Sequence, residues 1–188
     1  MIERVPGEGR YARLEREQRW VLSGLPPEVE RPVSITDLYI SGTRLRLRRM
    51  VREETVVRKL AQKVRPAPAD PSLVKLTNVY LSEEEYAVLA ALGGAALTKI
   101  RWRWPEAGRD LVVDEFGGSL SGLVLAEAEL GPDDPHADPP LFALAEVTDD
   151  DRFSGGSLSQ TSAGQLGRFL ADLRTLAGEG GDADEVPG

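Results

Sequence analysis

Arginines recur at every second position of one short segment, which is the spacing that places side chains on one face of a β-strand. Arg44, Arg46 and Arg48 fall on one face, and Leu45 and Leu47 fall on the other. A planar guanidinium binds phosphoryl oxygens in pairs, so a row of three is suited to holding a phosphate chain. In an ordinary sandwich the same row would simply face water.

The same alternation of charged and apolar residues recurs in three further segments. Their charged faces carry Glu15, Glu17 and Arg19, then Lys99, Arg101 and Arg103, then Glu127 and Glu129. Carboxylates bind hard cations such as Mg²⁺ or Mn²⁺, so acidic and basic rows together are suited to a metal ion and a polyphosphate. Buried charge is costly unless it is paired, so the rows either face one another around a lumen or are all solvated. The residues alone leave both arrangements open.

The composition is that of one globular domain. The chain has 188 residues, of which 41% are hydrophobic and 29% are charged. Its net charge of -8 disfavours a general nucleic-acid binder, and no apolar run is long enough to span a membrane. Residues 1–19 are charged throughout and the chain has no cysteine, so we expect a cytoplasmic protein without a signal peptide or disulfides.

Strand-like segments dominate the sequence. Those with alternation or β-rich composition are residues 10–22, 38–51, 55–64, 73–81, 96–104, 110–116 and 124–130. One helix is expected after the capping box formed by Ser82 and Glu85, and a second over residues 162–176, where leucines recur at helical spacing. Both helices are expected to be packing elements. The acidic tail 178–188 is expected to be disordered, which leaves 1–177 as the domain.

Taken in order, these motifs resemble the CYTH family, also called triphosphate tunnel metalloenzymes, which includes class IV adenylate cyclases, thiamine triphosphatases and inorganic triphosphatases. The family opens with Glu-x-Glu-x-Lys, which Glu15-Arg16-Glu17-Gln18-Arg19 resembles except at its last residue. The matches that follow, in the family's order, are Arg44-Leu45-Arg46, Lys59, Lys99-Ile100-Arg101, Asp114-Glu115-Phe116, Gly122-Leu123 through Glu127-Ala128-Glu129, and Glu146-Val147-Thr148. The resemblance covers residues 10–160.

The resemblance implies an α+β, mainly β fold, which is an eight-stranded antiparallel β-barrel, open at both ends as a tunnel, with peripheral helices. It also implies divalent-metal-dependent hydrolysis of a small triphosphate, such as inorganic triphosphate, inside the charged lumen, with Mg²⁺ or Mn²⁺ as cofactor. Glu17 and Arg19 would act in catalysis. The residues that would bind phosphate are Arg44, Arg46, Lys59, Lys99 and Arg101. The residues that would bind the metal are Glu15, Glu17, Asp114, Glu127 and Glu129.

Two positions depart from the family's motifs. Arg19 stands where the family has a lysine, and Asp151 stands where many members carry another lysine. These departures leave open a non-catalytic module that binds polyphosphate or a nucleotide. A class IV-like adenylate cyclase ranks lower, because no residue set for base recognition is evident. A β-sandwich with charged outer faces is the remaining alternative.

The expected partner is therefore a small-molecule triphosphate or polyphosphate, with no nucleic acid polymer and no membrane, and the sequence defines no oligomeric state. The single histidine, His136, is expected to be a solvated loop residue and not a catalytic base. Lys63, Arg49 and Arg52 are expected in solvent or at the tunnel mouth. The three tryptophans are expected to pack on the outside of the barrel beneath helices.

Overall fold

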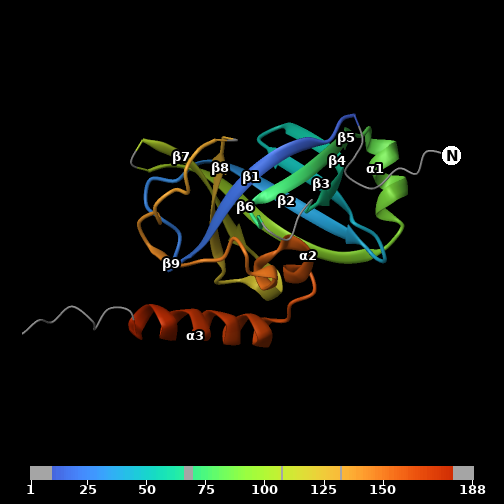
Figure 1. Ribbon diagram of the computed structural model, residues 1–188. Helices are drawn as coiled ribbons and strands as arrows, with labels where there is room; N and C mark the ends of the chain where they lie inside the picture. The colour runs from blue at the N-terminus through green and yellow to red at the C-terminus, as the bar shows by residue number, and fades with distance from the viewer. Residues whose placement is uncertain (1–9, 66–69, 107, 132, 180–188) are drawn as a thin grey trace, which may run out of the picture.

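The computed structural model describes residues 10–65, 70–106, 108–131 and 133–179, which form a closed antiparallel β-barrel with helices at its periphery (Figure 1). The strands are β1 (Arg13–Leu22), β2 (Glu30–Ile40), β3 (Leu45–Arg52), β4 (Thr55–Val64), β5 (Leu73–Tyr80), β6 (Gly94–Glu106), β7 (Arg109–Phe116), β8 (Val124–Leu130) and β9 (Ala143–Glu146). The helices are α1 (Glu83–Ala90), α2 (Gly155–Leu158) and α3 (Ala163–Glu179), with 3₁₀ turns η1 (Gly118–Leu120) and η2 (Asp151–Phe153). None of the helices in this described part of the chain has an apolar stretch long enough to cross a membrane.

Strand β1 closes the barrel. The strand order is β5-β4-β3-β2-β6-β7-β8-β1, and β1 also pairs with β5. One edge of β1 pairs with β8, while the other edge pairs first with β5 and then with β9. The expected eight-stranded antiparallel barrel is confirmed, with β9 as an additional strand. The alternative of a β-sandwich is wrong.

The β2–β3 hairpin corrects one predicted element. Residues 38–51 read as a single strand, but Gly42 adopts a φ of 71° and the Thr43 backbone N–H donates to the Ile40 carbonyl, so the chain turns there. The strand before this turn starts at Glu30, earlier than predicted, because Pro32 and mixed polar residues obscure its alternation. The four-residue strand β9 was not predicted.

Helix α1 begins where the capping box places it. The Ser82 side chain accepts a hydrogen bond from the Glu85 N–H, and the Glu85 carboxylate accepts one from the Ser82 N–H. The expectation that this helix is a packing element holds only weakly, because none of its residues is buried and Val88 is largely exposed. Its apolar stripe is too narrow to form part of a core.

Helix α3 closes an apolar cluster at one end of the barrel (Figure 1). Its buried residues include Leu166, Leu170 and Leu173. They belong to the same cluster as Val21 and Leu97, which lie two residues from Arg19 and Lys99 on the same strand faces. The inner wall of the barrel is therefore charged along part of its length and apolar where α3 covers it. The helix continues to Glu179, so the tail predicted from 178 starts inside it, and residues 180–188 lie outside the described residues.

The tryptophans pack on the outer face, as expected, but not beneath helices. Trp20 and Trp104 are buried in a second cluster, and the segment after β8 covers them. Phe142 from this segment lies 6.3 Å from Trp104 between ring centroids. The described members of the cluster include no residue of α1, α2 or α3. The expectation was wrong because the Pro-rich segment 133–142, which contains no helix or strand, is long enough to cover the sheet.

Truncation of a leucine on α3 tests how far this helix supports the barrel. We expect Leu166→Ala to lower the free energy of unfolding by about 2–5 kcal/mol, since the residue is 3% exposed and its removal leaves a cavity. Chemical denaturation measures the change. Arg168→Ala, on the exposed side of the same helix, should change stability by less than about 0.5 kcal/mol. Equal effects of both substitutions would contradict the packing described.

Candidate functional site

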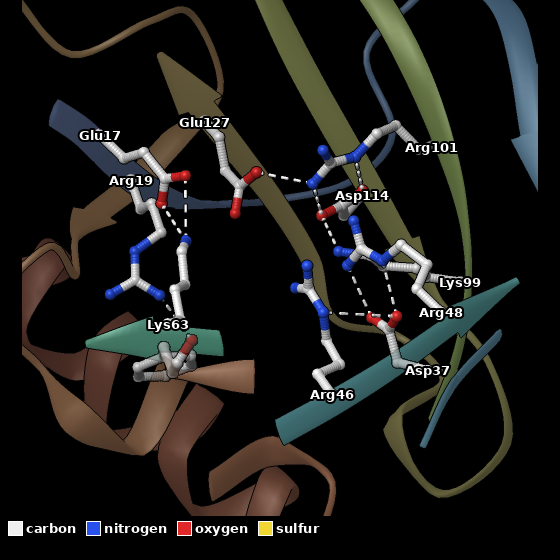
Figure 2. A network of polar contacts seen from close by, with 11 residues as sticks. Glu17, Arg19, Asp37, Arg46, Arg48, Lys63, Lys99, Arg101, Asp114 and Glu127 are labelled. Carbon is white, nitrogen blue, oxygen red and sulfur yellow. Dashed lines mark hydrogen bonds and ion pairs between the residues drawn. The ribbon is translucent and has the colours of Figure 1, made fainter. Parts of the chain in front are cut away.

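A cavity of about 280 Å³ lies inside the barrel, and charged side chains from six strands line it. The cationic residues are Arg19, Arg46, Arg48, Lys59, Lys63, Lys99 and Arg101. The acidic residues are Glu15, Glu17, Asp37, Glu127 and Glu129. The charged faces predicted from the alternation therefore surround a common lumen (Figure 2), and the arrangement in which they face bulk water is wrong.

Asp37 holds two of the lumen arginines. Its carboxylate accepts two hydrogen bonds from Arg48, from Nε at 2.6 Å and from Nη2 at 2.7 Å. Arg46 Nε lies 3.8 Å from the same carboxylate and forms an ion pair without a hydrogen bond. Asp37 is 1% exposed. The antiparallel register of β2 and β3 makes Asp37 and Arg48 direct neighbours, so the hairpin itself positions the pair.

Asp114 plays the equivalent part on the other side of β6. It accepts two hydrogen bonds from Arg101, both at 2.7 Å, and one from the ammonium of Lys99. Arg101 also donates to Glu127 at 2.7 Å, which extends the network across to β8. Figure 2 shows these contacts as a continuous chain from Glu127 to Lys99. Each buried aspartate thus braces two cations that point into the lumen.

The pKa values follow from this pairing. Burial alone would raise the pKa of Asp37, but the hydrogen bond from Arg48 and the nearby arginine charges outweigh it, so the pKa falls below 3.8. For Asp114 burial is likewise outweighed, by Lys99 and Arg101, which hold its pKa well below the usual range. Both carboxylates are therefore ionised at neutral pH and remain fixed partners of the cations.

Lys59 differs from the braced cations. It projects from β4 beside Arg48, its register partner on β3, and forms no hydrogen bond or ion pair within the described residues. Burial and the charges of Arg48, Arg46 and Arg101 lower the pKa of Lys59 to about 8. The lumen therefore contains a lysine that titrates close to neutral pH and has no carboxylate of its own.

The acidic side of the lumen is only partly neutralised. Glu17 and Glu129 are register partners on β1 and β8, and Glu15 lies two residues before Glu17 on the same face of β1. Lys63 donates to both oxygens of Glu17, at 2.7 and 3.0 Å. Burial, and then repulsion by Glu17, raise the pKa of Glu15. Negative charge is thus in excess here, which is the environment that a bound cation relieves.

These carboxylates fit a divalent cation by their chemistry, although they do not form a ready set of ligands. Within the described ranges, no group of three or more acidic or histidine side chains is already placed to hold a metal ion. Glu15, Glu17 and Glu129 supply hard oxygen donors on adjacent strands, and their mutual repulsion would be reduced by Mg²⁺ or Mn²⁺. Asp114 is less suited, because its oxygens are already bound to Lys99 and Arg101.

Arg19 is tied to the C-terminal part of the chain. Its Nη1 donates to the Phe153 carbonyl at 2.9 Å and its Nη2 donates to the Thr148 carbonyl at 3.2 Å. The side chain still lines the cavity beside Glu17 (Figure 2). An arginine at this position therefore secures the segment that follows β9, a contact that the single ammonium of a lysine would not make with the same geometry.

The lumen brings together most of the residues predicted from the sequence. The predicted site residues that line it are Glu15, Glu17, Arg19, Arg46, Lys59, Lys99, Arg101, Glu127 and Glu129. Arg44 lies in the adjoining pocket at the mouth, and Asp114 lies behind the lumen wall. Asp151 is exposed on η2 and lines neither cavity, so its carboxylate adds no negative charge to the lumen. His136 is exposed in a loop, as expected.

Four polar or charged residues of the described lumen lining were not among the predicted site residues. Lys63 was expected in solvent or at the mouth, but it lines both the lumen and the mouth pocket and is paired with Glu17. Arg48 shares the predicted arginine face, and the alternation alone could have included it. Asp37 and Tyr39 also line the lumen. They lie on a strand whose boundary was predicted incorrectly, so their position opposite the arginines was not evident.

Comparison with solved structures supports the fold. Two crystal structures of the protein NE1496, one described as a hypothetical protein and one as an inorganic triphosphatase, superimpose with a TM-score of 0.55 at 21% identity. They cover 79% and 78% of this chain and 99% and 95% of their own chains. The PH1819 protein of Pyrococcus horikoshii OT3 superimposes with a TM-score of 0.46 at 15% identity, over 89% of this chain and 90% of its own. No protein-family model and no curated protein matches the sequence. The resemblance to the tunnel metalloenzymes is thus confirmed for the fold.

Removal of one buried aspartate tests the bracing of the cations. We expect Asp37→Asn to lower the free energy of unfolding by about 3–5 kcal/mol, because it leaves the buried Arg48 charge without its partner. The control is Glu30→Gln, which removes one of the two carboxylate partners of the far more exposed Arg103 and should cost at most about 1 kcal/mol. Urea denaturation at neutral pH measures both. Similar costs for the two variants would contradict the role assigned to Asp37.

Proposed function

We propose that the protein hydrolyses a small triphosphate inside the lumen, with Mg²⁺ or Mn²⁺ as cofactor. The observation that carries the proposal is the enclosed cavity in which cations braced by buried aspartates face a group of under-neutralised glutamates. The proposal is supported by the fold shared with a solved structure that is named an inorganic triphosphatase. A triphosphate carries a row of anionic oxygens, which matches the first group, and a divalent cation matches the second.

The braced cations would bind the phosphates. Arg46, Arg48, Lys99 and Arg101 point into the cavity from strands β3 and β6, which flank β2. Because Asp37 and the second aspartate hold their side chains in place before any ligand arrives, little reorganisation would be needed on binding. Each aspartate neutralises only part of the positive charge that it braces, so an attractive potential for an anion remains.

The glutamates would hold the metal. Glu15, Glu17 and Glu129 are the residues proposed for this role, with Glu127 beside them and bound to Arg101. A divalent cation bound there would neutralise charge on the phosphoryl group that is transferred and on the group that leaves. Asp114 is proposed to position Lys99 and Arg101, and not to bind the metal.

The reaction consumes one water molecule. The water oxygen forms a bond to the terminal phosphorus, and the bond from that phosphorus to its bridging oxygen breaks. Diphosphate and orthophosphate leave, and the pH determines which of them carries the proton lost by the water. Lys59 binds as an ammonium at neutral pH and, with a pKa of about 8, exchanges its proton more readily than an ordinary lysine. Its position among the arginines makes it our candidate for moving this proton.

A second function is favoured by the contacts of Arg19. Because its guanidinium is engaged by the carbonyls of Phe153 and Thr148, it is less free to orient a water molecule or to act on the substrate. A module that binds triphosphate without hydrolysing it would retain every other feature of the lumen. Turnover and binding must therefore be measured separately.

Phosphate release from tripolyphosphate tests the enzymatic proposal. With Mg²⁺ or Mn²⁺ the purified protein should release orthophosphate, and Arg46→Ala and Glu129→Gln should each lower kcat/KM by about 100-fold or more, since each removes a charge that faces the reacting group. Glu54→Gln, on the exposed β3–β4 turn, is the control and should retain activity. Ligand-dependent stabilisation without any product would favour the binding module instead.

The pH dependence of binding tests the role of Lys59. We expect tripolyphosphate to bind with constant affinity below about pH 8 and more weakly above it, by up to about tenfold per pH unit, because only the charged ammonium attracts the anion. Calorimetry without divalent metal measures this without turnover. Lys59→Arg should weaken the dependence near pH 8, because an arginine stays charged, while burial also lowers the pKa of Lys99 to about 8 and this lysine accounts for the dependence that remains. A dependence as steep as that of the unaltered protein would contradict the role of Lys59.

A further inference from the structure

A second cavity of about 280 Å³ opens from the lumen toward the mouth of the barrel. The two cavities share Glu17, Arg19, Tyr39, Arg46, Lys63 and Gly155, so they form one continuous space. We call the second cavity the mouth pocket. Residues that line only this pocket include Arg44, Arg65 and Ser72.

The mouth pocket carries an excess of positive charge. Five cationic residues line it, against one carboxylate, Glu17, which already binds Lys63. Arg44 is exposed and forms no hydrogen bond or ion pair in the described part of the chain. Arg46 Nε is buried at the junction and also lacks a hydrogen-bond partner there. In a protein of net charge -8, this excess of cations over carboxylates in the described lining favours the binding of an anion.

The walls of the mouth pocket do not suit a nucleoside. Its single aromatic residue within the described lining is Tyr39. The Tyr39 hydroxyl packs directly against Gly155, since a Cβ added at Gly155 would lie 1.9 Å from the hydroxyl oxygen. This contact holds the Tyr39 ring at the junction of the two cavities. A base-binding pocket ordinarily offers an aromatic face on which the base stacks. Arginines that project beside a continuous channel are instead suited to further phosphate groups.

We propose that the mouth pocket is a phosphate subsite, so that the protein binds linear polyphosphates longer than triphosphate more tightly than it binds triphosphate or a nucleoside triphosphate. This inference rests on the proposed binding of a triphosphate in the lumen. Three phosphates occupy the lumen beside Arg48, Lys99 and Arg101. The chain then continues past Arg46 and Lys63 to Arg44 and Arg65.

Calorimetry in a metal-free buffer tests the subsite without turnover. The ligands are tripolyphosphate, linear hexapolyphosphate and ATP. We expect hexapolyphosphate to bind about tenfold or more tightly than tripolyphosphate, because contacts with two further arginines are added. A longer chain can also place different phosphates in the lumen, which by itself tightens its apparent binding, so the comparison with a variant is needed. In the protein that carries both Arg44→Gln and Arg65→Gln, the ratio of the two dissociation constants should fall close to the value that this statistical effect alone gives.

The control is Arg168→Gln, which removes an exposed arginine of α3 that lines neither cavity and should leave the ratio unchanged. Equal affinities for the two polyphosphates in the unaltered protein would overturn the subsite but not the proposed function, and they need no variant to be interpreted. A gain for ATP that equals the gain for hexapolyphosphate and is lost in the double variant would identify a nucleoside pocket and overturn the proposal. Absence of binding by tripolyphosphate would overturn the proposed function itself.

Discussion

The charge inside this small barrel is the constraint on which the rest of the structure depends. A lumen of this size is normally filled with apolar side chains, and unpaired charge there would cost more than the fold could offset. Seven cationic side chains line the cavity. Asp37 and Asp114 make this tolerable because both are nearly excluded from solvent and each forms ion pairs with two of the cations. The fold thus stabilises a strongly charged interior with pairs that also hold the ligand-facing groups in position.

The wall of the lumen is not uniform at the end of the barrel where β1, β2 and β7 end. On the side of β6, β7 and β8, leucine and phenylalanine side chains beneath α3 continue the inner wall and exclude water. The mouth pocket, in which cationic residues dominate, lies at the same end of the barrel, beside the β2–β3 turn and the start of β5. Lumen charges next to the apolar wall interact across a medium less polar than water on that side, which strengthens their attraction for an anion.

Much of the barrel could be predicted from the sequence, because a period of two reports directly which residues share a face. The strands β4 and β8 and the capped start of α1 were predicted to the residue. The alternation left open whether the charged rows face a lumen or solvent, and only the resemblance to the tunnel metalloenzymes implied the lumen. Asp37 could not be found in this way, since its role depends on a register that the turn at Gly42 sets. The residues that pack on the tryptophans could not be predicted either. No sequence pattern in the segment after β8 shows that this segment, and not a helix, covers them.

The pairing of β1 determines when the barrel can form. This strand stands near the beginning of the chain, yet its partners are β5, β8 and β9, so its residues meet residues 73–76, 125–130 and 143–146. Contacts so distant along the chain require the closure of long loops and slow the folding of β-rich proteins. During synthesis β1 emerges before β5, β8 and β9 and remains unpaired until these later strands have left the ribosome. Glutamates lie on one face of β1, so the unpaired strand does not expose two apolar faces. This reduces its tendency to associate with other chains.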